Sequence, residues 1–388
     1  MQVLIVPDHF KGCLTAGEAA AAMQAGFCDI FPDWQYQRLP LADGGEGTLD
    51  LLLQVLPGTR VATVVHDPLG REIQAHIGIV DGGHTAILEM AQASGLLLLD
   101  AKERDPLRTA STGTGEMIRA ALDQGCQKIV MGIGGSASND GGMGLLSALG
   151  IRFYDVEGQV LPPCGAALAQ VRSIDASRLD ERLQNCGVEI ICDVDSPLLG
   201  DSGATRMFGP QKGADQIAIE VLESGMKNFA DCIEHSIGRD IRHIPGSGAA
   251  GGVGAACLAF LGARLRPGID SIADLIDLDE KICAADLVLT GEGRIDAQTI
   301  RGKTIAGIAK RCQRLGKPLI VLAGSRSGET DVFRELGVDV ILTSLPRLGE
   351  ETELFREGAD HLRETARNTA ALLRLGGRLS LTSAQIFG

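Results

Sequence analysis

The stretch Val3-Leu4-Ile5-Val6-Pro7-Asp8 decides the fold. Its continuous apolar run is typical of a parallel strand that is buried on both faces. A parallel strand needs parallel neighbours, and the matching βαβ units lie at the other end of the chain, from about residue 286. The first strand is therefore expected to join strands from the far end of the chain in one discontinuous α/β domain.

Local signals around this framework agree with it. Thr15 and Glu18 form a capping box, and a helical spacing of apolar residues follows as far as Ile30. The C-terminal part predicts strands, a short helix and a long amphipathic helix. The predicted strands are 287–289, 319–322 and 338–342, and the predicted helices are 304–312 and 354–373.

The middle of the chain has a different pattern. Residues 73–79 alternate between apolar and other side chains, and Asp81-Gly82-Gly83 separates them from the apolar run 86–88, which indicates an antiparallel hairpin. We therefore predict an α/β fold of two domains with a ligand cleft between them. The first is a flavodoxin-like or Rossmann-like parallel-sheet domain of residues 1–69 and 285–388, and the second is an inserted α+β domain of residues 70–284 with a mixed or antiparallel sheet.

Composition excludes several classes of protein. The chain has 36 Lys and Arg against 50 Asp and Glu, a net charge of −14, which argues against sequence-independent binding of nucleic acid. No stretch approaches the ~18 apolar residues of a membrane span, and the start lacks the features of a signal peptide, so a cytoplasmic location is expected. The 10 cysteines include no C-x-x-C pair and are interpreted as reduced core residues, and the His spacing favours no zinc site.

Glycine is unusually abundant, with 51 among 388 residues where about 7% is average. The glycines gather in five polar stretches, of which one follows an apparent strand, 128–131, and precedes an apparent helix, 143–149. In such an arrangement, successive backbone N–H groups can converge on an oxyanion, although tight packing of small residues is the competing interpretation. The five stretches are 42–48, 111–116, 132–142, 246–254 and 291–296.

Two nucleotide motifs occur in a context that does not support them. Gly246–Gly251 fits the dinucleotide pattern G-x-G-x-x-G, but the preceding residues 239–245 make a poor buried strand. Ala297–Thr304 resembles a P-loop with alanine in place of the first glycine, but six residues intervene after the strand that ends near Thr290. Lys303 alone remains a phosphate-binding candidate, with a solvated lysine as the alternative.

Carboxylates lie next to these loops. Phosphoryl transfer needs acidic ligands for Mg²⁺, N–H groups and cations for phosphates, and a carboxylate that accepts the proton of the acceptor hydroxyl. Each carboxylate alone could equally cap a helix or stabilise a turn. The candidates are Asp8 with Lys11, Asp43 with Glu46, Asp140, Asp193, and Glu292 with Asp296.

Over essentially its whole length, the sequence resembles the bacterial type-1 glycerate kinase family. The resemblance implies ATP- and Mg²⁺-dependent phosphorylation of D-glycerate, with 2-phosphoglycerate as the expected product and 3-phosphoglycerate as the alternative. It also implies two α/β domains, one built from both chain ends. His9 and Ser196 depart from the family pattern, which usually has serine and asparagine there. The matching blocks are 7–12, 40–48, 132–144, 192–194, 208–214, 246–254, 291–296 and 302–303.

These considerations lead to one hypothesis for the site. Asp193 is the expected base, because it follows an apparent strand, and Lys11 is the other candidate catalytic residue. Substrate binding is assigned to Asp8, Asp43, Glu46 and Arg294, and the metal to Glu292 and Asp296. The ATP phosphates are assigned to Gly134, Gly135, Ser136, Ser138, Asn139, Asp140, Lys212 and Lys303.

Two other functions and the assembly stay open at this point. An NAD-dependent dehydrogenase would use the Gly246–Gly251 loop, and a non-catalytic sugar-acid sensor would bind its ligand without turnover. The expected partners are small molecules, D-glycerate and ATP, and neither nucleic acid nor a membrane. A homo-oligomer is compatible with the sequence.

Overall fold

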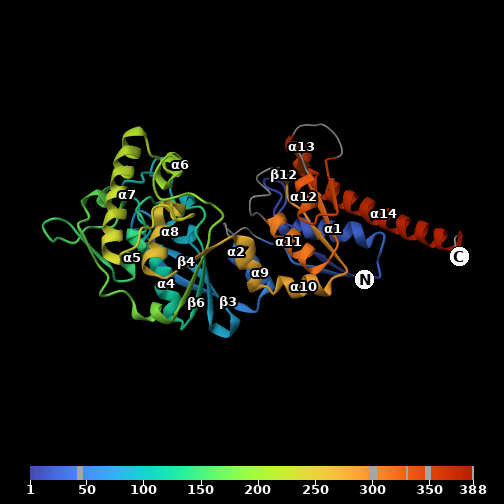
Figure 1. The fold of residues 1–388 in the computed structure, drawn as a ribbon, viewed down its shortest axis with the longest axis horizontal. Helices are drawn as coiled ribbons and strands as arrows, with labels where there is room; N and C mark the ends of the chain where they lie inside the picture. Colours follow the sequence, from blue (N-terminus) through green and yellow to red (C-terminus); the bar gives the residue numbers. More distant parts are fainter. Residues whose placement is uncertain (42–46, 297–303, 329–330, 346–350, 387–388) are drawn as a thin grey trace. The chain divides into compact units, whose positions relative to one another are not determined.

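The computed structural model describes residues 1–41, 47–296, 304–328, 331–345 and 351–386. The chain forms two compact units. The terminal unit comprises Met1–Asp43 and Ile272–Gly388, and the inserted unit comprises Gly44–Ser271. The blue N-terminal segment and the orange-to-red C-terminal segment of Figure 1 thus share one unit.

The terminal unit contains a parallel sheet. Val3 pairs with Leu287 and Ile5 with Leu289, so the two ends of the chain meet in adjacent strands, β1 and β11. Numbered within the unit, the strands have the flavodoxin-like order 2-1-3-4-5. All five described strands are parallel, and the chain adds strands on one side of β1 first and then on the other, so a topological switch point lies between β1 and β11. Among the described residues the five strands are ordered β2 (Gln35–Arg38), β1 (Gln2–Ile5), β11 (Leu287–Thr290), β13 (Leu319–Ala323) and β15 (Val340–Thr343).

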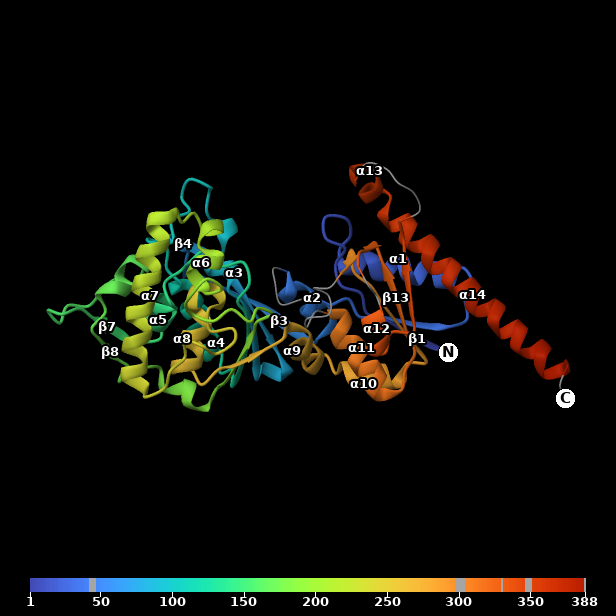
Figure 2. The same ribbon diagram turned by 45° about the horizontal axis from the view of Figure 1, so that its top comes forward.

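Helices cover both faces of this sheet, as Figure 2 shows. On one face, α1 (Ala16–Cys28) and α14 (Gly358–Ile386) bury apolar side chains against β1, β11 and β13. The predicted capping box begins α1, but that helix ends before Ile30. A Cβ on Gly26 would lie 2.3 Å from the carbonyl oxygen of Arg363, so glycine is what allows α1 and α14 to cross so closely. On the other face lie α10 (Leu278–Ala284) and α11 (Thr304–Leu315).

The inserted unit contains a mixed sheet. Strands β10, β9, β6 and β5 are parallel, whereas β5, β4 and β3 form antiparallel hairpins. The carboxyl ends of the parallel strands therefore lie at the same edge as the β3–β4 turn. Among the described residues the six strands are ordered β10 (Arg264–Arg266), β9 (Gly187–Ile191), β6 (Lys128–Gly132), β5 (Thr85–Glu89), β4 (Glu72–Val80) and β3 (Gly58–His66).

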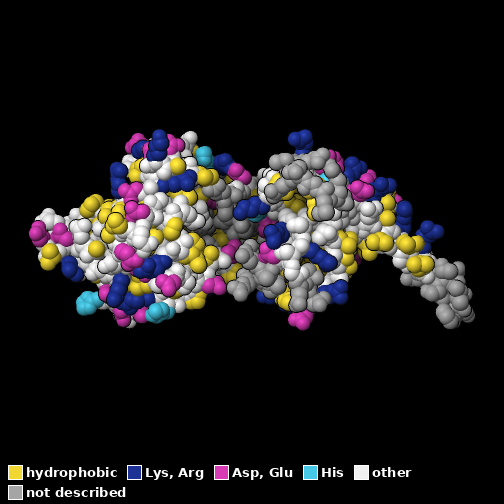
Figure 3. Space-filling view, turned by 90° about the horizontal axis from the view of Figure 1, so that it is seen from above, with side chains coloured by type: hydrophobic (Ala, Val, Ile, Leu, Met, Phe, Trp, Pro, Cys, Tyr) yellow, Lys and Arg dark blue, Asp and Glu magenta, His cyan; other side chains and the backbone are white. Residues whose placement is uncertain are grey.

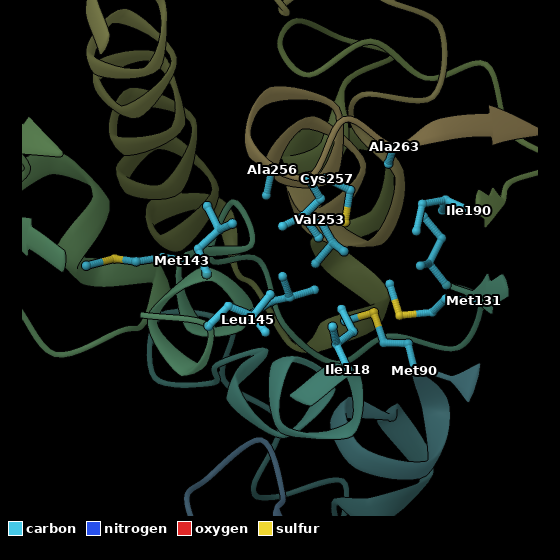
Figure 4. Close-up of a cluster of buried hydrophobic side chains, with 14 of the residues drawn as sticks. Met90, Ile118, Met131, Met143, Leu145, Ile190, Val253, Ala256, Cys257 and Ala263 are labelled. Atoms are coloured by element: carbon cyan, nitrogen blue, oxygen red, sulfur yellow. The ribbon is translucent and has the colours of Figure 1, made fainter. Parts of the chain in front are cut away.

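The core of the inserted unit joins this sheet to its helices, as the buried side chains of Figure 4 illustrate. Met131 of β6 and Ile190 of β9 lie in one cluster with Ile118 of α4 (Thr112–Asp123), Leu145 of α5 (Met143–Ala148) and Val253 of α8 (Ala249–Phe260). At roughly 25 cal/mol per Å² of buried apolar surface, such a cluster is the main source of stability. It fixes the loops at the edge of the sheet.

The remaining described elements are short, apart from α7. They are α2 (Thr48–Val55), η1 (Asp81–Gly83), α3 (Ala91–Ser94), η2 (Leu96–Leu98), β7 (Arg152–Tyr154), η3 (Gly165–Gln170), β8 (Ser173–Asp175), η4 (Glu181–Asn185), α6 (Ala204–Phe208), η5 (Pro210–Lys212), α7 (Gln216–Ile237), α9 (Gly268–Leu275), β12 (Arg294–Ile295), β14 (Ser325–Arg326), α12 (Asp331–Glu335) and α13 (Glu351–Arg356).

The predicted fold class is confirmed: the chain has an α/β fold whose two large sheets are one parallel and one mixed, and the described residues also form the small two-stranded sheets β12–β14 and β7–β8. The domain boundaries predicted at 69/70 and 284/285 differ from the division at 43/44 and 271/272. The first difference arises because β3, which the sequence analysis did not predict, pairs along its whole length with β4. A strand must belong to the same unit as the sheet that satisfies its backbone hydrogen bonds.

The far part of α14 carries exposed apolar side chains, seen towards the C-terminus in Figure 3. Leu372 is 61% exposed and Leu379 is 62% exposed. Among the described residues, no helix is both long and apolar enough to cross a membrane. The expectation that the chain can form a homo-oligomer stays a prediction.

Candidate active site

In the terminal unit, two predicted carboxylates follow the central strands. Asp8 comes shortly after β1 and Glu292 after β11, where the order of strands reverses. The amide N–H of Asp8 donates to the carbonyl of Gly291 at 2.9 Å, which joins the two loops. In open parallel sheets, ligands bind beyond the carboxyl ends of the strands at such a switch point.

The Asp8 carboxylate is buried and held on both oxygens. Its Oδ2 accepts a 2.5 Å hydrogen bond from the hydroxyl of Thr304, the first residue of α11. Its Oδ1 accepts from the backbone N–H of His9 and lies 2.7 Å from Nδ1 of the His9 ring. Asp8 therefore orders the start of α11 and the His9 side chain, and His9, a departure from the family pattern, has a defined partner.

The loop after β11 approaches the loop after β1 closely because its residues are small. A Cβ on Gly293 would lie 3.1 Å from the backbone nitrogen of Lys11. A Cβ on Gly324, which follows β13, would lie 2.4 Å from the carbonyl oxygen of Gly293. The glycines thus bring the backbone of Lys11 beside the segment that carries Glu292 and Arg294.

The charged groups of this edge differ in exposure. Lys11 and Arg294 are exposed, whereas Glu292 is buried. Arg294 donates from Nη2 to the Ser327 hydroxyl at 3.1 Å, and its Nε lies 3.8 Å from an Asp296 carboxylate oxygen. Two cations that reach solvent beside buried carboxylates can bind an organic acid. The predicted residues Asp43, Glu46 and Lys303 lie outside the described residues.

The described residues offer few ligands for the expected Mg²⁺ ion. Within the described ranges, no group of three or more His, Cys, Asp and Glu side chains is placed to hold a metal ion. Mg²⁺ in nucleotide enzymes commonly needs only one or two carboxylates together with substrate phosphates. The buried carboxylate of Glu292, at the switch point, fits that smaller requirement.

In the inserted unit, the glycine-rich loop after β6 is held by a buried lysine. Lys212 is 2% exposed, and its Nζ donates to the Ser136 hydroxyl at 2.8 Å and to the Ser138 carbonyl at 2.6 Å. Burial lowers the pKa of Lys212 from 10.5 to about 7, and the negative charge of Asp140 offsets part of this shift. The Lys212 amine, which carries a positive charge below that pKa, thus lies behind a loop whose Gly134 and Gly135 are exposed.

Two other predicted residues of this loop have unsatisfied polar atoms. The Ser138 hydroxyl and Oδ1 of Asn139 are fully buried and have no hydrogen-bond partner among the described residues. The Asn139 amide nitrogen donates to the Thr205 hydroxyl at 3.0 Å, so its side-chain orientation is fixed. Buried polar atoms are rarely left unpaired, and exceptions often mark a ligand or water site.

Asp140 has a structural role that the sequence analysis did not predict. Its Oδ2 accepts from the backbone N–H and the hydroxyl of Ser111 and from the N–H of Gly144, and its Oδ1 accepts from Gly142. The carboxylate thus occupies the N-terminal ends of both α4 and α5. The helix N-terminus that was expected to bind a phosphate is already occupied by this negative charge.

The glycines of 246–254 serve packing. A Cβ on Gly251 would lie 2.2 Å from the carbonyl of Ser138, and Gly141 donates its N–H to the carbonyl of Gly251 at 2.9 Å. Residues Ala250, Gly251 and Gly252 have positive φ angles, and no strand precedes them within the described part of this segment. The dinucleotide motif therefore lacks the preceding strand that would position a pyrophosphate. Its glycines pack against the glycine-rich loop after β6.

Asp193 lies at the carboxyl end of β9, as predicted. Its side chain is exposed, and its Oδ1 accepts a 2.8 Å hydrogen bond from the backbone N–H of Gly268, the first residue of α9. Both interpretations of this carboxylate, helix cap and base, are thus compatible with its position. The neighbouring Glu189 and Arg266 form an ion pair at 3.3 Å.

Sequence reasoning missed two polar groups at these edges. Thr304 holds the Asp8 carboxylate, although it was noted only as a helix start and as the end of the P-loop-like motif. Glu89, the last residue of β5, is buried and accepts from the N–H of Leu49 at 2.9 Å and from the Gln92 amide at 2.7 Å. A carboxylate at the end of an apolar strand was the signal that could have found Glu89.

Comparison with known proteins agrees with this geometry. The sequence profile described as "Glycerate kinase family" matches residues 3–374. The chain belongs to the glycerate kinase family. Membership makes it an enzyme, a kinase, and implies ATP as co-substrate. This confirms the resemblance seen in the sequence and leaves the dehydrogenase and sensor hypotheses without support.

Individual members of the family are similar over their full length. The glycerate kinase of Bacillus subtilis (strain 168) is 44% identical over 98% of this chain and 100% of its own. The glycerate 2-kinase of Escherichia coli (strain K12) is 44% identical over 97% of this chain and 99% of its own. A crystal structure named for glycerate kinase 2 from Salmonella typhimurium LT2 superposes with a TM-score of 0.87 at 43% identity, over 97% of this chain and 99% of that one.

Proposed function

We propose that this kinase transfers the γ-phosphoryl group of ATP to D-glycerate and that the product is 2-phosphoglycerate. The observation that carries the proposal is Lys212, a buried cation hydrogen-bonded to the glycine-rich loop at the carboxyl edge of the inserted sheet, in a chain of the glycerate kinase family. The choice of the 2-phosphate rests on the name of the Escherichia coli relative.

The inserted unit is proposed to bind the phosphates of ATP. The N–H groups of the exposed residues Gly134 and Gly135 would face the phosphates, and the charge of Lys212 would act through Ser136 from behind the loop. The unsatisfied atoms of Ser138 and Asn139 would receive a polar group of a substrate or a water. Asp140 is proposed to position the loop rather than to contact phosphate, because its oxygens already accept four hydrogen bonds.

The terminal unit is proposed to bind glycerate. Lys11 and Arg294, both exposed, would pair with its carboxylate, and Asp8, Asp43 and Glu46 would contact its hydroxyls. Glu292 and Asp296 would hold Mg²⁺, and Lys303 would add a phosphate contact. When bound, Mg²⁺ supplies positive charge that stabilises the phosphates during transfer. The expected ligand cleft where the two units meet stays part of this proposal.

Asp193 is proposed as the base. It would accept the proton of the glycerate 2-hydroxyl while that oxygen bonds to the γ-phosphorus and the bond from phosphorus to ADP breaks. Its exposed carboxylate at the end of β9 supports the role, since a base must reach the substrate. The hydrogen bond from Gly268 would fix the orientation of the carboxylate.

The identity of the phosphorylated product tests which hydroxyl of glycerate is the acceptor. The full chain is incubated with ATP, Mg²⁺ and D-glycerate, and the phosphorylated product is identified by phosphorus NMR. A signal of 2-phosphoglycerate supports the proposal, whereas 3-phosphoglycerate would contradict the assignment of the hydroxyl. ATP consumption without a phosphorylated glycerate would contradict the choice of acceptor.

A further inference from the structure

A hollow of about 420 Å³ lies at the carboxyl edge of the inserted sheet and has no role in the proposal above. One wall comes from the β3–β4 turn and the start of β4, with Asp67, Arg71, Glu72 and Ile73. The other wall is the segment 97–103, which follows α3. Figure 2 shows α3 beside the β4 strand of the same unit. The volume falls within the ~300–1,000 Å³ typical of small-molecule sites.

The hollow lies next to the glycine-rich loop after β6, the loop to which Lys212 donates its hydrogen bonds. The segment that leads into its second wall runs antiparallel to residues 135–137. Leu96 donates its N–H to the Gly135 carbonyl at 2.8 Å, and Ala137 donates to the Ser94 carbonyl at 2.8 Å. A ligand with its phosphates on the loop therefore has this hollow next to it, two residues along the chain from the Gly95–Ser136 bridge.

Its walls are rigid. Arg71 donates from Nε to Asp67 at 2.5 Å and from Nη1 to Glu103 at 2.7 Å, which ties the turn to the second wall. Burial alone would raise the pKa of the Asp67 carboxyl, but hydrogen bonds from Arg71 and Leu69 outweigh it and lower that pKa. The ion pair is thus kept at neutral pH, and the hollow needs little ordering when a ligand enters.

The lining combines aliphatic side chains with a negative rim. Leu97 is 73% exposed although it is a large apolar residue, and Ile73, Leu98 and Leu99 lie beside it. The rim has four carboxylates, Asp67, Glu72, Asp100 and Glu103, against one cation, Arg71. The carboxylates of Glu72 and Asp100 accept no hydrogen bond from the described residues. Such a surface attracts a neutral, flat, donor-rich group and repels anions.

We propose that this hollow binds the adenosine part of ATP, with the base against Leu97 and Ile73 and its amino group and ribose hydroxyls donating to the carboxylates of the rim. The inference rests on the proposed use of ATP and on the phosphates lying at the neighbouring loop. Carboxylates are established acceptors for ribose hydroxyls. Glycerate, an anion, would not enter here.

The same chemistry predicts which base is preferred. The 6-amino group of adenine donates a hydrogen bond, whereas the 6-oxo group of guanine accepts one and would face a carboxylate. A site built for a donor discriminates against a ligand that leaves its polar groups unpaired. ATP should therefore be a better phosphoryl donor than GTP. The low aromatic content of 3% agrees with a base held by aliphatic side chains.

Leu97→Glu tests the contact with the base. Leu97 is exposed, so the variant should fold, and the loss of apolar contact plus an added negative charge should raise KM for ATP about tenfold or more. KM for D-glycerate should stay within about twofold. Val156→Glu is the matched control, because Val156 is 81% exposed in the same unit and does not line the hollow. An unchanged ATP KM in Leu97→Glu would overturn the inference.

Two further measurements separate this inference from the proposed function. Titration with the non-hydrolysable analogue adenosine 5′-(β,γ-imido)triphosphate should show weaker binding to Leu97→Glu than to Val156→Glu. The double variant Glu72→Gln/Asp100→Asn, whose amides can donate to guanine, should lower the preference for ATP over GTP about threefold to tenfold. If the unsubstituted enzyme transfers phosphate from ATP to glycerate but the variants show none of these changes, only the assignment of the hollow to adenosine is refuted. If the unsubstituted enzyme shows no transfer, the proposed function is refuted.

Discussion

The two sheets of this protein carry charge at their carboxyl edges in different ways. In the terminal unit, Lys11 and Arg294 reach solvent, and close approach of glycine backbones places the segments that carry them. In the inserted unit, Lys212 is buried, and its amine donates hydrogen bonds to a loop whose Gly134 and Gly135 are exposed. The first arrangement suits direct contact with a small acid, and the second suits a fixed field behind a phosphate.

Asp193→Asn should lower kcat about 10²–10⁴-fold if Asp193 is the base, because removal of a positioned base has effects of that size. The asparagine Oδ1 can still accept from the N–H of Gly268, so the cap of α9 is kept. A variant with near-normal kcat would reduce Asp193 to a helix cap, and Asp193→Ala would then show only a loss of stability.

Lys212→Met should lower kcat/KM about 10²–10³-fold, the effect seen when one pre-oriented group that stabilises a transition-state charge is removed. The loss should appear with ATP as the varied substrate. Lys227→Met is the matched control, because Lys227 is exposed on α7 of the same unit and should leave both constants unchanged. A variant that loses stability but keeps kcat/KM for ATP would argue that Lys212 only stabilises the fold.

Arg294→Ala should raise KM for D-glycerate about 10–100-fold, because a hydrogen bond to a charged group contributes ~1.5–3 kcal/mol. KM for ATP should change little, in contrast to Lys212→Met. Steady-state kinetics with each substrate varied in turn measures both. A larger effect on ATP than on glycerate would reverse the assignment of the two edges.

Gly324→Ala should destabilise the terminal unit by about 1–3 kcal/mol, since overpacking of a close contact has this magnitude. The added Cβ would lie 2.4 Å from the carbonyl oxygen of Gly293 and push the two loops apart. Gly17→Ala in α1 is the control, because its Cβ would meet nothing within 4 Å. Urea unfolding measures both variants, and equal stabilities would show that the close approach of these loops is not needed.

The lowered pKa of Lys212 predicts a dependence of stability on pH. The unfolded state, with a lysine pKa of 10.5, binds more protons than the native state, with a pKa of about 7, across the interval between them. Stability should therefore rise with pH from about pH 7 to pH 9, by ~1 kcal/mol per pH unit. The difference in unfolding free energy between the unsubstituted protein and Lys212→Met isolates this term from other titrating groups. A difference that is constant with pH would mean that the Lys212 amine is not titrating near 7.

The sequence predicted the fold class because the decisive signals are local. Continuous apolar runs at Val3–Val6 and 319–322, and the capping box of Thr15 and Glu18, reflect contacts that each segment makes almost by itself. Strand β3 was missed because many of its side chains are partly or fully exposed, so its pattern is weak and only the pairing with β4 defines it. For the same reason, the first boundary was predicted at 69/70, whereas the two units divide at 43/44.

The sequence named candidate site residues, but it did not predict the contacts that several of them make. Asp8 and Asp193 became candidates because they follow apparent strands, and Lys212 became one because it lies in the block 208–214 that resembles the family. The role of Asp140 depends on Ser111, which is distant in the sequence, and no spacing rule relates the two. The burial of Lys212 depends in the same way on the packing of η5 against the loop of β6.

The pairing of Val3 with Leu287 has a consequence for synthesis on the ribosome. At about 5–20 residues per second, β11 is made roughly 15–60 s after β1. The inserted unit can fold during this interval, because all its strands precede residue 272. We expect a nascent chain stalled near residue 280 to resist protease over the inserted unit and to be cleaved within its first 40 residues. The first strand of the protein would thus be among the last to gain its full set of neighbours, and its apolar run needs shielding until then.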